Sequence, residues 1–199
     1  MRQPLLTLLA VVALTGCAGV APPPPAQSPS AAQTPDAVQV SQQQGGKFIV
    51  LAGPKRRHAA PYLGVESTNY DLLRSFIDTR NGEIKHQLYV QDSYGGRTRN
   101  WDAARLATGP ALRFLPITVS EVTCENGCSY AEEFAAALPD PLLRSNPQGF
   151  AVVFTSRSGH EKTVAVPGDL VAMQLAAVDQ ARAARPAAAA AITPPAAPR

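Results

Sequence analysis

The sequence has few charged and few aromatic residues, and this scarcity excludes a class of partner. Charged residues make up 17% and aromatic residues 6% of the 199 residues, whereas about a quarter of an average globular protein is charged. Between Lys47 and Gln180 the basic and acidic residues are equal in number, so the formal net charge of +3 arises outside this part. A nucleic-acid-binding protein normally presents a concentrated basic face. The sequence therefore indicates no nucleic-acid partner.

Metal-binding and catalytic signatures are also missing. The chain has three cysteines and three histidines, and the histidines (His58, His86 and His160) are scattered, whereas a structural zinc site needs four closely placed ligands. No phosphate-binding loop, paired-carboxylate motif or Gly-x-Ser-x-Gly elbow is found. We expect no metal, no cofactor and no enzymatic activity.

No apolar run is long enough to span a membrane. The longest, Leu5 to Leu14, has half of the roughly 20 residues that a membrane-spanning helix requires. It follows one basic residue, Arg2, and ends in small residues, which is typical of a secretory signal. We therefore predict that residues 1–16 form a signal peptide.

The end of this signal carries a more specific motif, Leu14-Thr15-Gly16-Cys17. It resembles the bacterial lipoprotein signal, whose box reads Leu, a small residue, Gly or Ala, and then Cys. The resemblance implies that Cys17 becomes the lipidated first residue of the mature protein, anchored in a membrane by two or three acyl chains. Ala18 stands where Asp would retain an enteric lipoprotein at the inner membrane. The implied location is the outer membrane, facing the periplasm, with the inner membrane as the less favoured site.

Two segments of low complexity flank the part of the chain that can form a core. Residues 17–46 are rich in Pro, Gln and Ala, which favours an extended, disordered tether. Residues 186–199 form an Ala/Pro tail that we also expect to be disordered. The globular domain is therefore predicted to cover residues 47–185.

Within this domain, alternating apolar residues and turn signals predict a mainly β fold. Asn81-Gly82 is the strongest hairpin signal, and His86 follows it on the apolar face, where we expect a hydrogen-bonded core histidine. Trp101 to Leu106 fits either a strand or a short helix. Val171, Leu175 and Val178 form an apolar helical stripe. We predict about seven strands in an antiparallel, hairpin-linked sandwich or bent sheet, with one C-terminal α-helix packed on it.

Cys124 and Cys128 bracket a turn between two predicted strands. In an exported protein such a pair favours a disulfide. A redox dithiol or half of a metal site is the alternative, but redox motifs usually separate their cysteines by two residues at the start of a helix.

Two further clusters were considered as sites. Lys55, Arg56, Arg57 and His58 form a candidate binding loop, either simply solvated or in contact with acidic lipid or polysaccharide. A second cluster comprises Ser156, Ser158, His160, Glu161 and Asp169, which are the residue types of a hydrolase triad. These residues are also typical of a tight turn, so their presence is explained without a catalytic role.

The order of these elements is similar to that of small bacterial lipoproteins of unassigned function with an all-β core. The residues that carry this likeness are Arg74, Asn81-Gly82, the run from His86 to Val90, Cys124, Cys128, Glu132 and Pro167. We expect a membrane-anchored periplasmic lipoprotein that acts as a non-enzymatic structural or partner-binding module of the cell envelope. A carrier of lipid or another apolar ligand, held between sheet and helix, is the alternative, and a hydrolase ranks third.

Overall fold

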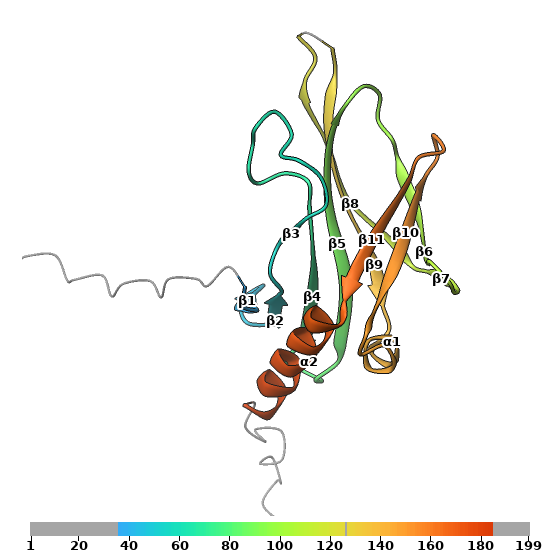
Figure 1. The fold of residues 1–199 in the computed structure, drawn as a ribbon. Coiled ribbons are helices and arrows are strands. Elements are labelled where there is room, and N and C mark those ends of the chain that lie inside the picture. Colours follow the sequence, from blue (N-terminus) through green and yellow to red (C-terminus); the bar gives the residue numbers. More distant parts are fainter. Residues whose placement is uncertain (1–35, 126, 185–199) are drawn as a thin grey trace, which may run out of the picture. The chain divides into compact units, whose positions relative to one another are not determined.

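The computed structural model describes residues 36–125 and 127–184, which form two antiparallel β-sheets and two helices (Figure 1). The larger sheet has seven strands in the order β1-β2-β4-β5-β9-β8, with the short β3 paired to β4. The smaller sheet has four strands in the order β11-β10-β6-β7. Apart from the gap at position 126, the described chain folds as one β-rich unit.

The longer strands follow the alternation of apolar residues in the sequence. The larger sheet contains β1 (Gln39–Gln43), β2 (Phe48–Ala52), β3 (Arg56–Arg57), β4 (Tyr70–Asp78), β5 (Ile84–Gly95), β8 (Phe114–Thr123) and β9 (Ser129–Leu138). The smaller sheet contains β6 (Trp101–Leu106), β7 (Ala111–Leu112), β10 (Gly149–Ser156) and β11 (Glu161–Pro167).

The main hydrophobic core lies between the two sheets. Because neighbouring side chains of a strand point to opposite faces, β5 contributes alternate residues such as Leu88 and Val90, and β9 contributes Phe134. Phe134 is 1% exposed and packs edge-on against Phe154 of β10, with ring centroids 5.0 Å apart. Contacts of this kind hold the smaller sheet over β5 and β9.

Two helices complete this core. The short α1 (Asp140–Ser145) follows β9 and buries Leu143, and α2 (Gly168–Ala183) follows β11 directly. Along α2, Leu170 and Val171 join the main core, while Val178 packs in a second cluster with Leu51 and Ile77. The helix therefore covers the part of the larger sheet, around β2 and β4, that the smaller sheet leaves open.

The structure confirms the predicted fold class, which is mainly β with antiparallel sheets and a C-terminal helix packed on them. Trp101–Leu106 is a strand, and the number of strands exceeds the expected seven because β1, β3 and β7 are short pieces without a clear pattern. The helical stripe is confirmed at Val171 and Val178, which are buried, while Leu175 is partly buried against the main core.

The predicted boundary between tether and globular domain, at residue 46, is wrong. The segment expected to be a tether up to residue 46 contains β1, whose residues from Gln39 to Gln43 pair with β2. This strand was missed because all five residues are exposed and four of them are Gln or Ser. Pairing of the backbone with β2, rather than burial of side chains, defines it. The predictions for residues 1–35 and 186–199 lie outside the described residues.

Candidate partner-binding edge and the polar clusters behind it

Strand β8 is an edge strand of the larger sheet and exposes three apolar side chains. It pairs with β9 on one side and is the last strand in the order, so its other side is unpaired among the described residues. Ile117, Val119 and Val122 are 43%, 56% and 51% exposed. An edge strand presents unpaired backbone N–H and C=O groups on which another strand can pair. We define Phe114–Thr123 with these side chains as the β8 edge.

Two irregularities limit how much of this edge can accept a partner. The register with β9 shifts between Pro116 and Thr118 and again between Glu121 and Thr123. Bulges and proline are features that discourage edge-to-edge pairing. Between the two shifts, Thr118 to Glu121 pair with β9 residue by residue. This four-residue stretch, centred on Val119, is the part of the edge best suited to regular pairing.

A groove of about 220 Å³ adjoins the β8 edge. Its wall on β8 runs from Phe114 to Val119, and Trp101, at the start of β6, and Phe134 line it from the sandwich side. Phe134 lies between two ring partners, with centroid distances of 5.3 Å to Trp101 and 5.8 Å to Phe114. The groove thus offers aromatic surface beside a strand edge, the combination that accepts an extended peptide with alternate side chains in pockets.

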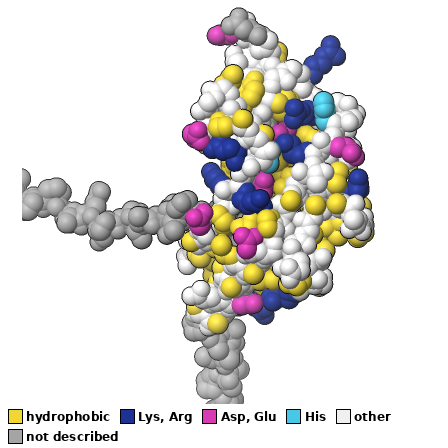
Figure 2. All heavy atoms as spheres, in the orientation of Figure 1, with side chains coloured by type: hydrophobic (Ala, Val, Ile, Leu, Met, Phe, Trp, Pro, Cys, Tyr) yellow, Lys and Arg dark blue, Asp and Glu magenta, His cyan; other side chains and the backbone are white. Residues whose placement is uncertain are grey.

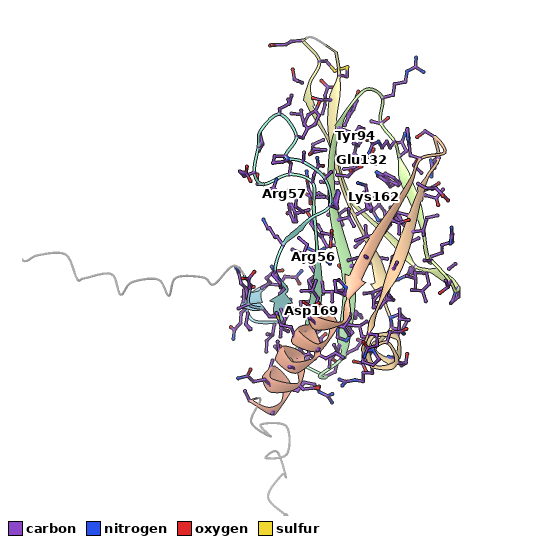
Figure 3. All side chains as sticks on the ribbon, viewed as in Figure 1. Arg56, Arg57, Tyr94, Glu132, Lys162 and Asp169 are labelled. Atoms are coloured by element: carbon purple, nitrogen blue, oxygen red, sulfur yellow. A yellow bond between two sulfur atoms is a disulfide. The ribbon has the colours of Figure 1, made fainter. Side chains whose placement is uncertain are left out.

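The wall that carries Trp101 is held by the carboxylate of Glu132, which is 2% exposed. Its Oε1 accepts hydrogen bonds from the backbone N–H groups of Arg99 (2.8 Å) and Asn100 (3.0 Å), and its Oε2 from that of Trp101 (3.2 Å). The Tyr94 hydroxyl donates to Oε1 as well, and the two side chains lie side by side in Figure 3. Burial, followed by this bond to Glu132, raises the pKa of Tyr94. One buried carboxylate therefore fixes the turn between β5 and β6.

A second buried carboxylate, Asp92 on β5, ties the two sheets together. It accepts hydrogen bonds from Arg99 Nη1 (2.7 Å) and Trp101 Nε1 (3.1 Å), and its Oδ1 lies 2.9 Å from Lys162 Nζ on β11. Burial on its own raises the pKa of Asp92, but His58, Lys162 and Arg99 together lower it well below its usual range. Asp92 therefore remains ionised, and Trp101 is held by both carboxylates.

His58 completes this charged cluster. Its Nδ1 lies 3.6 Å from Asp71 Oδ1 and its Nε2 lies 3.7 Å from Asp92 Oδ1, distances of ion pairs rather than hydrogen bonds. Its side chain is 9% exposed. Burial, the largest single influence, lowers the pKa of His58, but the two carboxylates outweigh burial and the resulting pKa is raised. His58 thus lies between Asp71 of β4 and Asp92 of β5, two neighbouring strands of the larger sheet.

The side chains of the predicted binding loop, Lys55 to His58, contact other residues of the same domain. Arg56 and Arg57 form β3, and Arg56 donates to the carbonyl of Ala165 on β11 (3.1 Å). Arg57 pairs with Glu66, and Lys55 stacks 4.3 Å from the ring centroid of Tyr70. Figure 2 shows Lys and Arg side chains with a histidine and acidic side chains gathered on this face, and Figure 3 places Arg56 and Lys162 between β3 and β11. The prediction of a loop is wrong for Arg56 and Arg57, because their backbone pairs with β4.

A third polar network connects α2, the larger sheet and α1. Gln174 Nε2 donates to Ser75 Oγ (2.8 Å) and to the Leu51 carbonyl (3.0 Å). Ser75 Oγ lies 2.7 Å from His86 Nδ1, and His86 Nε2 lies 3.1 Å from Asp140 Oδ1. Burial lowers the pKa of His86, although Asp140 acts in the opposite direction. We therefore assign a neutral His86 that accepts from Ser75 and donates from Nε2 to Asp140, which confirms the expectation of a hydrogen-bonded core histidine.

The Ser75–His86–Asp140 row has the composition of a hydrolase triad but not its access. Ser75 is 0% exposed and its hydroxyl already bonds both Gln174 and His86. A nucleophilic serine must reach a substrate carbonyl. On the far side, Arg144 bonds both Asp140 (2.9 Å) and Asp179 of α2 (3.0 Å), so the row closes into a ring that begins and ends on α2. Its role is to dock the helices.

The structure does not assemble a triad from the candidates in the sequence, because the serines bond within one turn and Asp169 lies far from it. At the β10–β11 turn, Ser156 Oγ accepts from the backbone N–H of His160 (2.9 Å) and lies 3.0 Å from Ser158 Oγ. Asp169 lies at the start of α2, at the other end of β11 from this turn (Figure 3), and Glu161 begins β11. Turn chemistry accounts for the serines, as the composition indicated.

Two site predictions concern cysteines. Cys124 and Cys128 are joined in a disulfide next to the end of β8, which confirms the predicted pairing. Cys17 lies outside the described residues.

Within residues 36–125 and 127–184, no group of three or more His, Cys, Asp or Glu side chains is placed to hold a metal ion. Neither helix of this part of the chain has the length and apolar content to cross a membrane.

Sequence reasoning missed the residues that shape this region most. Glu132 was noted only as part of a motif, and Asp92 and Gln174 were not singled out. A signal for two of them was present, because β5 and β9 place Asp92 and Glu132 on the same strand faces as Val90 and Phe134. A carboxylate at an inward position of a buried strand requires a partner.

No family model, no curated protein and no solved structure matches this chain. The functional interpretation therefore depends on the geometry described above.

Proposed function

We propose that the protein is a membrane-anchored periplasmic lipoprotein that binds a protein partner of the cell envelope through the β8 edge and has no enzymatic role. The observation that carries this proposal is the exposed row Ile117, Val119 and Val122 on an unpaired edge beside an aromatic groove. A solvent-exposed apolar edge strand is a liability unless it is covered. An extended segment of a partner, paired to Thr118–Glu121, supplies that cover.

The expected affinity is low, which determines the kind of experiment. Burying the exposed halves of three aliphatic side chains yields about 2–4 kcal/mol. Roughly four new backbone hydrogen bonds add about 2–6 kcal/mol. Association of two free proteins costs about 4–15 kcal/mol, so the edge alone supports a weak complex. Acylation at Cys17, by holding the protein at the membrane, raises the local concentration toward a membrane partner.

Covalent capture in intact cells is therefore the appropriate test. A photo-crosslinking amino acid is placed at Val119 and, in a matched protein, at Val40, the exposed valine of the opposite edge strand β1. We expect one discrete protein adduct from position 119 and none of that size from position 40. Equal adducts from both positions, or none from position 119, contradict the proposal.

The membrane anchor is tested separately. Metabolic labelling with a fatty-acid analogue should mark the wild-type protein and not Cys17→Ser. Crosslinking at Val119 should then weaken in Cys17→Ser, because the free protein loses its high local concentration. Equal labelling of the two proteins contradicts lipidation without bearing on the β8 edge.

The carrier function remains the alternative, and one observation determines where its site would lie. Buried side chains lie at the interface between α2 and the larger sheet, among them Val171, Gln174 and Val178. A groove of about 370 Å³ lies elsewhere, beside His86, and we place the site of this alternative there.

A further inference from the structure

A groove of about 370 Å³ opens where β5 begins and β9 ends. Three segments that are distant in the sequence line it: the start of β5, β7 with Arg113 after it, and the run from the end of β9 to the start of α1. Pockets that bind small molecules in proteins have volumes of about 300–1,000 Å³. The groove is large enough for a small ligand.

The surface of the groove is mainly apolar. Ile84 and Leu112 are partly buried, Leu138 is 3% exposed, and Ala111, Ala137 and Pro139 add further apolar surface. Three polar side chains of the lining already have partners: His86 Nε2 lies 3.1 Å from Asp140, Asp140 also accepts from Arg144, and Gln87 Oε1 accepts from Arg74. The apolar part of the lining therefore favours a hydrocarbon chain.

The charged side chains on the rim of the groove differ in whether an opposite charge lies beside them. Lys85 lies 3.3 Å from Glu83, and both side chains are more than half exposed. Arg113 is exposed and, within residues 36–125 and 127–184, takes part in no ion pair or side-chain hydrogen bond. Asp140 is balanced by Arg144, so Arg113 is the uncompensated charge at this groove. An arginine guanidinium binds a carboxylate or phosphate in a bidentate manner.

We propose that this groove binds a small anionic amphiphile, with its chain against Ile84, Leu112 and Leu138 and its acidic head on Arg113. The lining is apolar where the chain would lie, and the unpaired cation stands at the rim. This binding site is independent of the β8 edge, since the two grooves share no lining residue.

The test uses the full-length Cys17→Ser protein and decanoate below its micellar concentration, measured by titration calorimetry. We expect saturable one-to-one binding, with decyltrimethylammonium, which has the same chain and the opposite charge, at least tenfold weaker. Arg113→Gln should weaken decanoate binding about tenfold, a change of about 1.4 kcal/mol. Arg97→Gln is the matched control, because Arg97 is also exposed and without an ion pair or side-chain hydrogen bond among the described residues.

A second variant tests the location of the chain. Ala111→Trp places a large side chain at an exposed position of the groove wall, and it should abolish binding while the melting temperature stays close to that of the parent. The proposal is overturned if decanoate shows no saturable binding, if the cationic amphiphile binds equally well, or if Arg113→Gln and Ala111→Trp both bind like the parent. None of these results bears on partner capture at Val119, so the two proposals fail independently.

Discussion

The two edges of the larger sheet differ in length and in chemistry. The β1 edge has five residues, of which only Val40 is a large apolar side chain and the others are Gln and Ser. The β8 edge has ten residues and exposes Ile117, Val119 and Val122. Short, polar edge strands resist pairing with other chains, whereas long apolar ones promote it. This difference is the reason that we propose the β8 edge, and not the β1 edge, as the docking strand.

The two edges are also supported differently. Behind β1, the strand β2 packs through Leu51 on Val178 of α2. Behind β8, the sandwich wall depends on the buried carboxylates of Glu132 and Asp92, which hold Trp101. A buried carboxylate requires hydrogen-bond donors, so Glu132 and Asp92 fix the positions of the groups that bond to them. The two edges therefore depend on different interactions, which are apolar packing behind β1 and hydrogen-bonded carboxylates behind β8.

The largest effect is expected from placing a charge on the β8 edge. Val119→Lys should reduce crosslinking from a probe at Ile117 at least tenfold, because pairing would then bury an ammonium group against an apolar partner. Val40→Lys makes the same chemical change at a 60%-exposed valine of β1 and should leave crosslinking unchanged. The yield of adduct per cell measures both, and equal losses would show that the two edges do not differ in function.

The next largest effect is expected on stability, from removing the carboxylate that holds the wall of the groove beside β8. Glu132→Ala leaves the backbone N–H groups of Asn100 and Trp101 and the Tyr94 hydroxyl without their acceptor, and Arg99 N–H keeps only its bond to Tyr94. The change should lower the free energy of unfolding by about 3 kcal/mol or more. Glu133→Ala removes the neighbouring, partly exposed carboxylate and should cost less than about 1 kcal/mol. Urea unfolding of both variants measures the difference, and similar values would contradict the anchoring role of Glu132.

A smaller effect is expected on the β1 side. Val178→Ala, at a 0%-exposed position, should lower the free energy of unfolding by about 2–3 kcal/mol. Leu175→Ala should lower it by less, since that side chain is only partly buried. Neither change should alter crosslinking at Val119. Thermal melts and adduct yields together show whether the two edges are independent.

The smallest effect is a dependence on pH. The pKa of His58 is raised in the folded protein, so the stabilisation it provides is fully present below its unfolded pKa of about 6.5 and is lost as the pH rises through the folded value. The free-energy difference between wild type and His58→Gln should therefore be larger at pH 5.5 than at pH 8.5. A difference that grows toward alkaline pH would show that Asp71 and Asp92 do not stabilise the imidazolium.

The sequence predicted the parts of this fold that depend on local pattern. The hairpin at Asn81-Gly82, the inward position of His86, the disulfide and the apolar stripe of α2 were all visible in spacing and residue type. The β1 strand was not, because its side chains bury nothing and only its pairing with β2 defines it.

The candidate site depended on information that the local sequence does not contain. Ile117 and Val119 alternate with polar residues as in any half-buried strand, and only the order of strands shows that β8 is an edge. Likewise, the segment from Lys55 to His58 is basic in the sequence, but its side chains have partners within the domain. These are Glu66, Asp71, Asp92, the ring of Tyr70 and the carbonyl of Ala165. Long-range pairing determines which charges and which apolar side chains remain available.

Amide hydrogen exchange tests the central claim most directly, because it compares the two edges in one sample. The full-length protein is crosslinked through a probe at Ile117, and exchange in the adduct is compared with exchange in the free protein. The account predicts slower exchange for the peptide containing Thr118 to Glu121 and unchanged exchange for the peptide containing Gln39 to Gln43. Slower exchange at the β1 peptide, or no change at the β8 peptide, would contradict the proposal that the β8 edge is the docking strand.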